Sequence, residues 1–188
     1  MQKQFPLTLL GIVCLAGGIA GCNSVIEIEQ IKPTQQPTVT RSPESSAPKT
    51  SPSNSISALE KAIFDQVNQY RKSQNLSALT LDSRISAQAK LHSEAMANGK
   101  VDFGHGGFED RVKAIAKSIP YRSASENVAF NQGYSDPATK AVDGWLKSPG
   151  HLKNIQGNFD LTGIAVVKNA QNEYYFTQIF IRRSRYGF

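Results

Sequence analysis

The chain has 188 residues, of which 39% are hydrophobic and 19% are charged, and its formal net charge is +6. This composition excludes a fully disordered chain and leaves room for one domain with a sizeable core. The mild positive charge is not accompanied by a nucleic-acid recognition motif, so we expect no nucleic-acid partner. The two cysteines, Cys14 and Cys22, are too few for a scaffold held together by disulfides.

The N-terminal segment is typical of an export signal. Residues 5–19 are mostly apolar, but a helix needs about 20 apolar residues to span a bilayer, and this run is shorter. The run ends in Ile19-Ala20-Gly21-Cys22, which resembles the bacterial lipobox, where the cysteine is acylated and becomes the first residue. We therefore expect residues 1–21 to be a lipoprotein signal peptide and Cys22 to anchor the chain, outside the cytoplasm, to a bacterial membrane. The alternative is an ordinary secreted protein in which Cys22 has no role.

The next segment predicts a tether followed by a single domain. Residues 22–55 are rich in proline, serine and threonine and contain no aromatic residue, which is typical of a disordered linker. Residues 56–188 have the usual size of one folded domain.

Helical signals come first in this domain. Ser57-Ala58-Leu59-Glu60 fits a capping box, and an apolar pattern of helical period follows it as far as Asn75. Asp82 or Ser83 can cap a second helix that ends near Gly99. His92 lies on the apolar face of this second helix, where we expect hydrogen-bonded packing rather than a ligand role.

Loops and shorter helices carry the more reactive side chains. Residues 102–107 are glycine-rich and predict a loop that presents His105, and residues 108–119 predict a short amphipathic helix. Asp136 and Pro137 predict the start of a helix with Trp145 on its buried stripe. Residues 148–150 end that helix and begin a short turn that carries His151.

The end of the chain predicts strands. Residues 161–167 and 174–181 are rich in β-branched and aromatic side chains, and residues 169–172 predict the turn between them. An antiparallel hairpin follows from this pattern. Helices that precede strands without regular alternation indicate the α+β class, with an antiparallel sheet covered by helices.

Seven motifs follow one another between residues 56 and 181. They are Val67-Asn68-x-x-Arg71, residues 76–81, His92-Ser93-Glu94-Ala95-Met96, Phe103-x-His105, Glu126-Asn127-Val128-Ala129, Trp145-x-x-Ser148-Pro149-Gly150-His151-x-x-Asn154-Ile155, and Gly163-Ile164-Ala165-Val166 with residues 174–180. In this order they resemble the bacterial branch of the CAP superfamily, also called the SCP or pathogenesis-related 1 family. The resemblance implies an α-β-α sandwich with a central antiparallel sheet flanked by helices.

The resemblance also implies a site. Eukaryotic members of the family hold two histidines and two glutamates that can bind zinc or another divalent ion. His105 and Glu126 match one pair, whereas Ser148 and Tyr175 stand where the second glutamate and the second histidine would fall. In bacterial relatives the histidine of the Ser-Pro-Gly-His segment, here His151, can substitute for the missing ligands. The resemblance thus implies the metal set His105, Glu126 and His151, with zinc as the expected ion. Two histidines and one carboxylate, with a position left for water, suit an open zinc site.

Two other interpretations remain open for these residues. Glu126 and the histidines can instead fasten loops by hydrogen bonds to backbone groups. A hydrolase would need a nucleophile, for which Ser148 and Ser125 are candidates, but no Gly-x-Ser-x-Gly motif occurs. For Arg71 and Arg111 we expect solvated pairing with acidic neighbours rather than contact with an anionic ligand.

The sequence therefore favours a membrane-anchored, extracytoplasmic binding module over an enzyme. Its ligand would be a divalent metal ion, a lipid or another small molecule, held in the cleft of histidine and glutamate side chains. The alternatives are a peptidase-like hydrolase of the cell envelope and a non-catalytic scaffold for another envelope protein.

Overall fold

The computed structural model describes residues 52–184. The predictions for the signal peptide, for Cys22 and for most of the tether therefore lie outside the described residues. Within residues 52–184, no helix is both long and apolar enough to cross a membrane. The elements, in chain order, are α1 (Pro52–Ser73), β1 (Thr80–Leu81), α2 (Ser83–Ala97), α3 (Phe108–Ala116), β2 (Tyr121–Gln132), α4 (Pro137–Lys147), α5 (Pro149–Gln156), β3 (Leu161–Lys168) and β4 (Glu173–Arg183).

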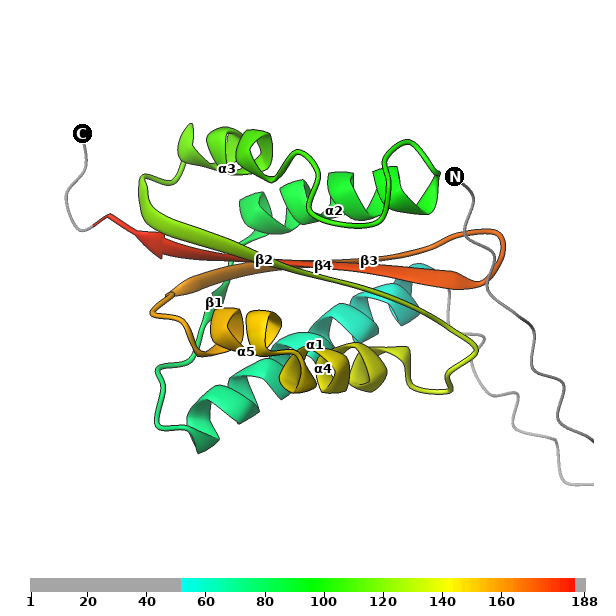
Figure 1. Ribbon diagram of the computed structural model, residues 1–188, viewed down its shortest axis with the longest axis horizontal. Coiled ribbons are helices and arrows are strands. Elements are labelled where there is room, and N and C mark those ends of the chain that lie inside the picture. Colours follow the sequence, from blue (N-terminus) through cyan, green and yellow to red (C-terminus); the bar gives the residue numbers. More distant parts are fainter. Residues whose placement is uncertain (1–51, 185–188) are drawn as a thin grey trace, which may run out of the picture. The chain divides into compact units, whose positions relative to one another are not determined.

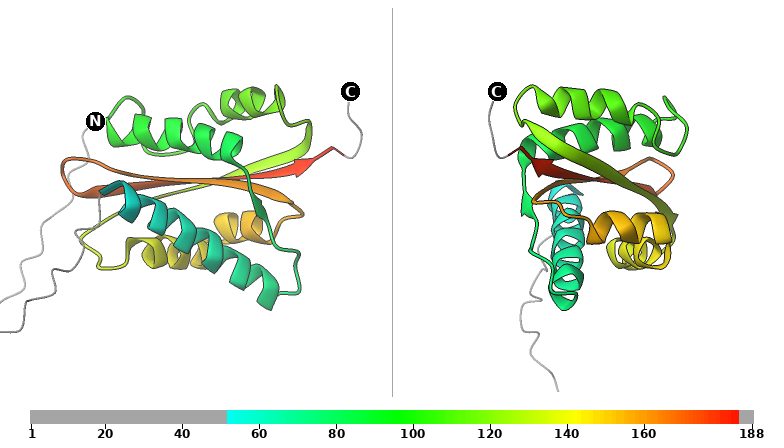
Figure 2. Two further views of the ribbon diagram at one scale, coloured as in Figure 1. Left: turned by 180° about the vertical axis from the view of Figure 1, so that it is seen from behind. Right: turned by 60° about the vertical axis from the view of Figure 1, so that its left-hand side comes forward.

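These elements form three layers around one four-stranded sheet. The strand order is β1-β3-β4-β2, and β4 is antiparallel to both of its neighbours. The short strand β1 pairs with β3 in parallel over two residues. Helices α2 and α3 cover one face of the sheet, and α1, α4 and α5 cover the other (Figure 1, Figure 2). The predicted α-β-α sandwich is confirmed.

Each face of the sheet has its own core, because side chains of a strand alternate between the two faces. Phe176 and Phe180 of β4 are fully buried on the side of α1, α4 and α5. Ile179 and Ile181 of the same strand are fully buried on the side of α2 and α3. Trp145 lies in the first core at 1% exposure, as its place on the helical stripe predicts, and its Nε1 donates to the carbonyl of Val128 at 2.9 Å.

Strand β2 is the main element that the sequence did not predict. Its 12 residues pair with β4 along almost their whole length. Two of its polar residues, Asn127 and Asn131, are buried, which removes the alternation of apolar and polar residues that marks a strand. Glu126 therefore lies within a strand and not in a loop.

The start of the first helix also differs from the prediction. Helix α1 begins at Pro52, so Ser57 lies inside the helix and does not cap it. The Glu60 side chain accepts a hydrogen bond from the Val166 amide of β3, at 3.1 Å, instead of completing a capping box. The predicted N-caps of α2 and α4 are confirmed, since Asp82 accepts from the Arg84 amide and Asp136 from the Thr139 amide.

Candidate functional site

The loop between α2 and α3 carries His105. Gly104 and Gly107 both have positive φ angles, 148° and 73°, which glycine adopts without strain. The Gly104 carbonyl accepts a hydrogen bond from Nε2 of His92 at 2.7 Å, and the Gly106 carbonyl accepts from Nη1 of Arg111 at the same distance. Two buried side chains thus fix the loop on both sides of His105.

Glu126 of β2 lies beneath this loop with its side chain only 1% exposed. Arg111 of α3 binds the carboxylate through two parallel hydrogen bonds, Nε to Oε2 at 2.9 Å and Nη2 to Oε1 at 2.8 Å. Such bidentate pairs are among the stronger hydrogen-bonded contacts in proteins. Arg111 pairs with an acidic neighbour, as predicted, but the pair is buried and not solvated, because the Arg111 side chain is only 10% exposed.

His105 completes the group from the solvent side. Its Nδ1 lies 3.0 Å from Oε1 of Glu126, and its side chain is 51% exposed. Because a carboxylate can only accept, Nδ1 carries the proton and Nε2 is the basic nitrogen. A carboxylate that fixes the tautomer and orientation of an imidazole in this way is found behind both metal ligands and general bases.

His92 has the packing role that the sequence predicts. Nη1 of Arg111 donates to its Nδ1 at 3.1 Å, so Nε2 carries the proton that goes to the Gly104 carbonyl. Burial lowers the pKa of His92, and the positive charge of Arg111 lowers it further. His92 is therefore a neutral spacer between α2, α3 and the loop.

His151 approaches the same place from α5. The centroids of the His105 and His151 rings are 6.3 Å apart. Burial and then the charge of His105 lower the pKa of His151, which favours its neutral form. Helix α5 is fixed to β2 because Asn127 donates to the His151 carbonyl and Asn154 donates to the Glu126 carbonyl, at 3.2 and 3.1 Å.

The structure thus brings His105, Glu126 and His151 together, but it limits what they can bind. Both oxygens of Glu126 already accept hydrogen bonds from Arg111, whose positive charge opposes a cation there. In the part of the chain that the structure describes, no group of three or more histidine, cysteine, aspartate or glutamate residues is arranged to hold a metal ion. The donor set does not fit a three-ligand site, which leaves the two imidazoles as the candidate ligands. Metal binding stays a prediction.

The serine candidates do not lie in a catalytic arrangement. The Ser125 hydroxyl is buried and has no hydrogen-bond partner among the described residues. Ser148 lies between α4 and α5, where its backbone amide bonds to the Trp145 carbonyl. Between residues 57 and 184, no serine hydroxyl is hydrogen-bonded to His105 or His151.

A shallow hollow lies beside His105. Its volume is about 460 Å³, and residues of the α2–α3 loop and the first turn of α3 line it. On the same loop as His105, Phe103 is 54% exposed and meets Phe130 of β2, which is 45% exposed, edge to face at 6.4 Å. Tyr175 packs on Phe130 at 5.1 Å, so aromatic rings occupy the position where the resemblance implies a second histidine.

The comparisons with known proteins agree with this fold. The profile of the CAP family, described as cysteine-rich secretory proteins, matches residues 64–180. Two proteins of Bacillus subtilis are similar: YkwD, described as uncharacterized, is 34% identical over 138 residues, and YlbC, described as an uncharacterized membrane protein, is 36% identical over 129 residues. The matches cover 70% and 66% of this chain but only 50% and 34% of those relatives, so the chain spans half of one and about a third of the other.

Solved structures of low identity share the sandwich. An extracellular protein containing an SCP domain from Bacillus anthracis superposes with a TM-score of 0.59 at 29% identity, covering 73% of this chain and 45% of that one. An outer surface protein of Borrelia burgdorferi also gives a TM-score of 0.59, at 22% identity, covering 68% of this chain and 94% of that one.

Proposed function

Because this chain belongs to the CAP family of cysteine-rich secretory proteins, we propose that it is an extracytoplasmic binding module, held at a bacterial membrane by a lipid on Cys22. The apolar run and the lipobox-like sequence before Cys22 support export and anchoring. Similarity to an extracellular SCP-domain protein and to a membrane protein of Bacillus species supports the same location.

The observation that carries the binding role is the pair of imidazoles of His105 and His151. His105 is oriented by Glu126 through Nδ1, so its Nε2 is left as a free acceptor at a half-exposed position. His151 lies beside it and favours the neutral form. Two neighbouring imidazoles, each in its neutral form, would suit a divalent transition-metal ion or a small polar ligand that donates hydrogen bonds. A bound zinc ion would be held by these two nitrogens and would supply open coordination positions for a further ligand.

Calorimetric titration of zinc into the metal-stripped chain tests this role. We expect one site of micromolar or tighter affinity that is lost in His105→Ala and in His151→Ala. Leu91→Ala is the control, because Leu91 of α2 is 59% exposed, whereas the neighbouring His92 itself holds the loop of His105 through the Gly104 carbonyl. Absence of zinc binding would reject the metal role and leave small polar ligands or a protein partner.

We do not propose a hydrolase for this site. The imidazole and carboxylate of His105 and Glu126 could serve as a general base, but catalysis by a serine also needs a hydroxyl within hydrogen-bond reach of the base. Neither Ser125 nor Ser148 makes such a contact. Covalent labelling of either serine by a fluorophosphonate probe would contradict this conclusion.

A further inference from the structure

The outer edge of β3 is only partly covered by its neighbour. Strand β1 pairs with β3 at two residues, and then Asp82 turns the chain into α2 as its N-cap. The amide of Asp82 donates to the carbonyl of Thr162, which shows that the backbone groups of Thr162 face β1. Because backbone groups of a strand alternate in direction, those of Ile164 and Val166 face the same edge beyond the end of β1.

Two side-chain oxygens cover the amides on this open edge. The Ile164 amide donates to Oγ of Ser86 at 3.2 Å, and the Val166 amide donates to Oε1 of Glu60 at 3.1 Å. Residues two apart in a strand repeat at about 6.6–6.8 Å, which is also the repeat of the carbonyls on one side of an extended peptide. Ser86 and Glu60 therefore stand where two carbonyl oxygens of a further strand would lie. No side chain among the described residues donates to the Ile164 or Val166 carbonyl.

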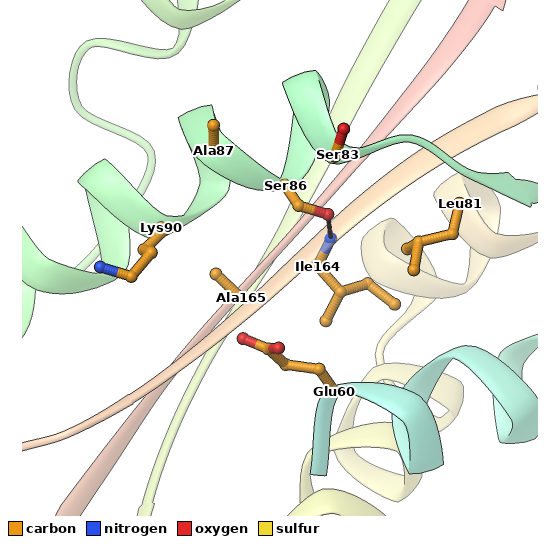
Figure 3. Close-up of a pocket in the computed structure, with 8 residues that line it drawn as sticks. All are labelled: Glu60, Leu81, Ser83, Ser86, Ala87, Lys90, Ile164 and Ala165. Atoms are coloured by element: carbon orange, nitrogen blue, oxygen red, sulfur yellow. Dashed lines mark hydrogen bonds between the residues drawn. The ribbon is translucent and has the colours of Figure 1, made fainter. Parts of the chain in front are cut away.

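A groove of about 290 Å³ lies over this edge, between α1 and α2 (Figure 3). Most of the α2 residues in its wall are small, namely Ser83, Ser86 and Ala87, so a backbone can approach the strand. Leu81, at the end where β1 stops, is 50% exposed although it is a large apolar residue. The groove thus continues the line of β1 and begins at an uncovered leucine.

We propose that this groove binds an extended peptide segment of a partner protein, which adds to the sheet as a strand beside β3. The carbonyls of the peptide take the place of Ser86 Oγ and Glu60 Oε1, and its amides pair with the Ile164 and Val166 carbonyls. An apolar side chain of the peptide covers Leu81. Addition of a strand to a sheet edge is an established way for proteins to recognise peptides.

The state of Glu60 supports this exchange. Burial raises the pKa of its carboxyl group, which means that its ionised form is poorly solvated where it lies. Displacement by a peptide carbonyl would return the carboxylate to water. The same contact protects the edge from uncontrolled pairing when no peptide is bound.

The test uses a synthetic peptide, acetyl-Lys-Thr-Val-Thr-Leu-Thr-Lys-amide, added to the isotope-labelled full-length chain. We expect shifts of the Ile164 and Val166 amide signals in nuclear magnetic resonance spectra. Two matched peptides carry N-methyl groups either on Val and Leu or on the three Thr residues. Only the residues whose N–H groups face β3 need them for binding. The peptide methylated on the other residues should therefore bind about as the parent does, and the peptide methylated on the residues that face β3 at least about tenfold more weakly.

Variants of the chain separate strand addition from binding through the Glu60 carboxylate. Glu60→Ala removes the competing acceptor, and we expect it to bind the peptide more tightly, whereas Ala87→Trp fills the groove and should abolish binding. Ala170→Trp, in the exposed turn between β3 and β4, is the control for the added indole. The proposal is wrong if the peptide leaves both amide signals unmoved, if both methylated peptides bind alike, or if Glu60→Ala abolishes binding.

Discussion

The partners of Glu126 show how one residue decides what a site can do. Its carboxylate lies in the interior, where an unpaired charge is costly. Arg111 supplies the paired charge, and the same guanidinium also donates to His92 and to the Gly106 carbonyl. Arg111 therefore holds the base of the α2–α3 loop together, and His105 depends on it through Glu126.

Removal of Arg111 should destabilise the fold strongly. Arg111→Met leaves the Glu126 carboxylate buried without a cation, and we expect the free energy of unfolding in urea to fall by about 3–5 kcal/mol. The double variant Arg111→Met with Glu126→Met should recover part of this loss, since it removes both charges. The exposed pair of Lys61 and Asp65 on α1 gives the control, because Lys61→Met should cost less than about 0.5 kcal/mol. Equal losses for Arg111→Met and Lys61→Met would contradict the buried pair.

Stability should fall in mild acid because of two histidines. Burial lowers the pKa of both His92 and His151 in the folded chain. The unfolded chain, with histidine pKa values near 6.5, then binds more protons than the folded one as the pH falls. We expect the free energy of unfolding to be highest above about pH 6.5 and to decrease from there down to the lowered pKa values.

Urea unfolding at a series of pH values between 8 and 5 measures this effect, the range being set around a pKa of about 6.5. His92→Gln should show a shallower decrease than the unchanged chain, and His151→Gln should remove a separate part of it. An identical pH dependence in His92→Gln would show that His92 titrates alike in the folded and unfolded states.

At the scale of elements, Arg71 of α1 holds the segment that follows α5. Arg71 is 2% exposed, and its guanidinium donates hydrogen bonds to four backbone carbonyls. These carbonyls belong to Ser77, Ile155, Gly157 and Phe159, at 2.9, 2.6, 2.9 and 3.3 Å. The solvated acidic pairing expected for Arg71 is wrong, since its partners are backbone carbonyls and its side chain is buried. Three of them lie at the end of α5 or lead into β3, so Arg71 holds the chain at the end of the helix that carries His151.

Arg71→Lys should therefore lower stability despite conserving the charge. An ammonium group lacks the planar set of donors that reaches four carbonyls, and each buried carbonyl left unpaired costs about 1–3 kcal/mol. We expect a loss of at least about 2 kcal/mol in chemical denaturation, together with faster amide exchange in α5. Arg122→Lys is the matched control, because Arg122 is exposed on β2 and should change neither quantity. If the two variants behave alike, the carbonyl contacts of Arg71 do not hold α5.

Strand β3 and helix α2 approach each other so closely at Gly163 that no side chain fits. A Cβ there would lie 2.2 Å from the backbone nitrogen of Ser86 and 2.3 Å from the carbonyl carbon of Ile85. Gly163→Ala must push the α2 backbone away from the sheet, and we expect it to cost about 1–3 kcal/mol or more in thermal unfolding. Gly144→Ala in α4 is the control, since open space surrounds that position and alanine should stabilise the helix by about 0.5–1 kcal/mol. Similar melting temperatures for the two variants would contradict the close contact.

The same elements show what the sequence could and could not predict. Helices α2 and α4 follow from their capping residues Asp82 and Asp136 together with an apolar period, both of which are local signals. Strand β2 carries no such signal, because buried Asn127 and Asn131 interrupt its apolar pattern and donate instead to the carbonyls of His151 in α5 and Pro137 in α4. Strand β1 has two residues and exists only because β3 pairs with it. Both strands thus depend on pairing with distant strands, which explains why the sequence pattern predicts neither β1 nor β2.

At the scale of the whole molecule, the sequence predicted which motifs matter but not how they are paired. His105, Glu126 and His151 do meet, as the motif order implies. The role of Arg111 depends on how α3 packs beside β2, which no spacing in the sequence encodes. The ion pair of Arg111 and Glu126 explains why the expected metal set lacks a free carboxylate in this fold, since the Glu126 carboxylate is already bound by the Arg111 guanidinium.

The attachment of the molecule to a membrane is the last prediction. No helix between residues 52 and 184 can cross a bilayer, so that part of the chain offers no helical membrane span. Acyl chains on Cys22 would provide an anchor, because each buried methylene contributes about 0.8 kcal/mol and more than one chain is needed for stable attachment. Cys22→Ala should move the protein from the membrane fraction to the soluble fraction in cell fractionation. Cys14→Ala is the matched control, since Cys14 lies inside the apolar run and should leave the protein membrane-bound. A Cys22→Ala protein that stays in the membrane fraction would mean that the signal segment is retained, and that lipid on Cys22 is not what holds the domain.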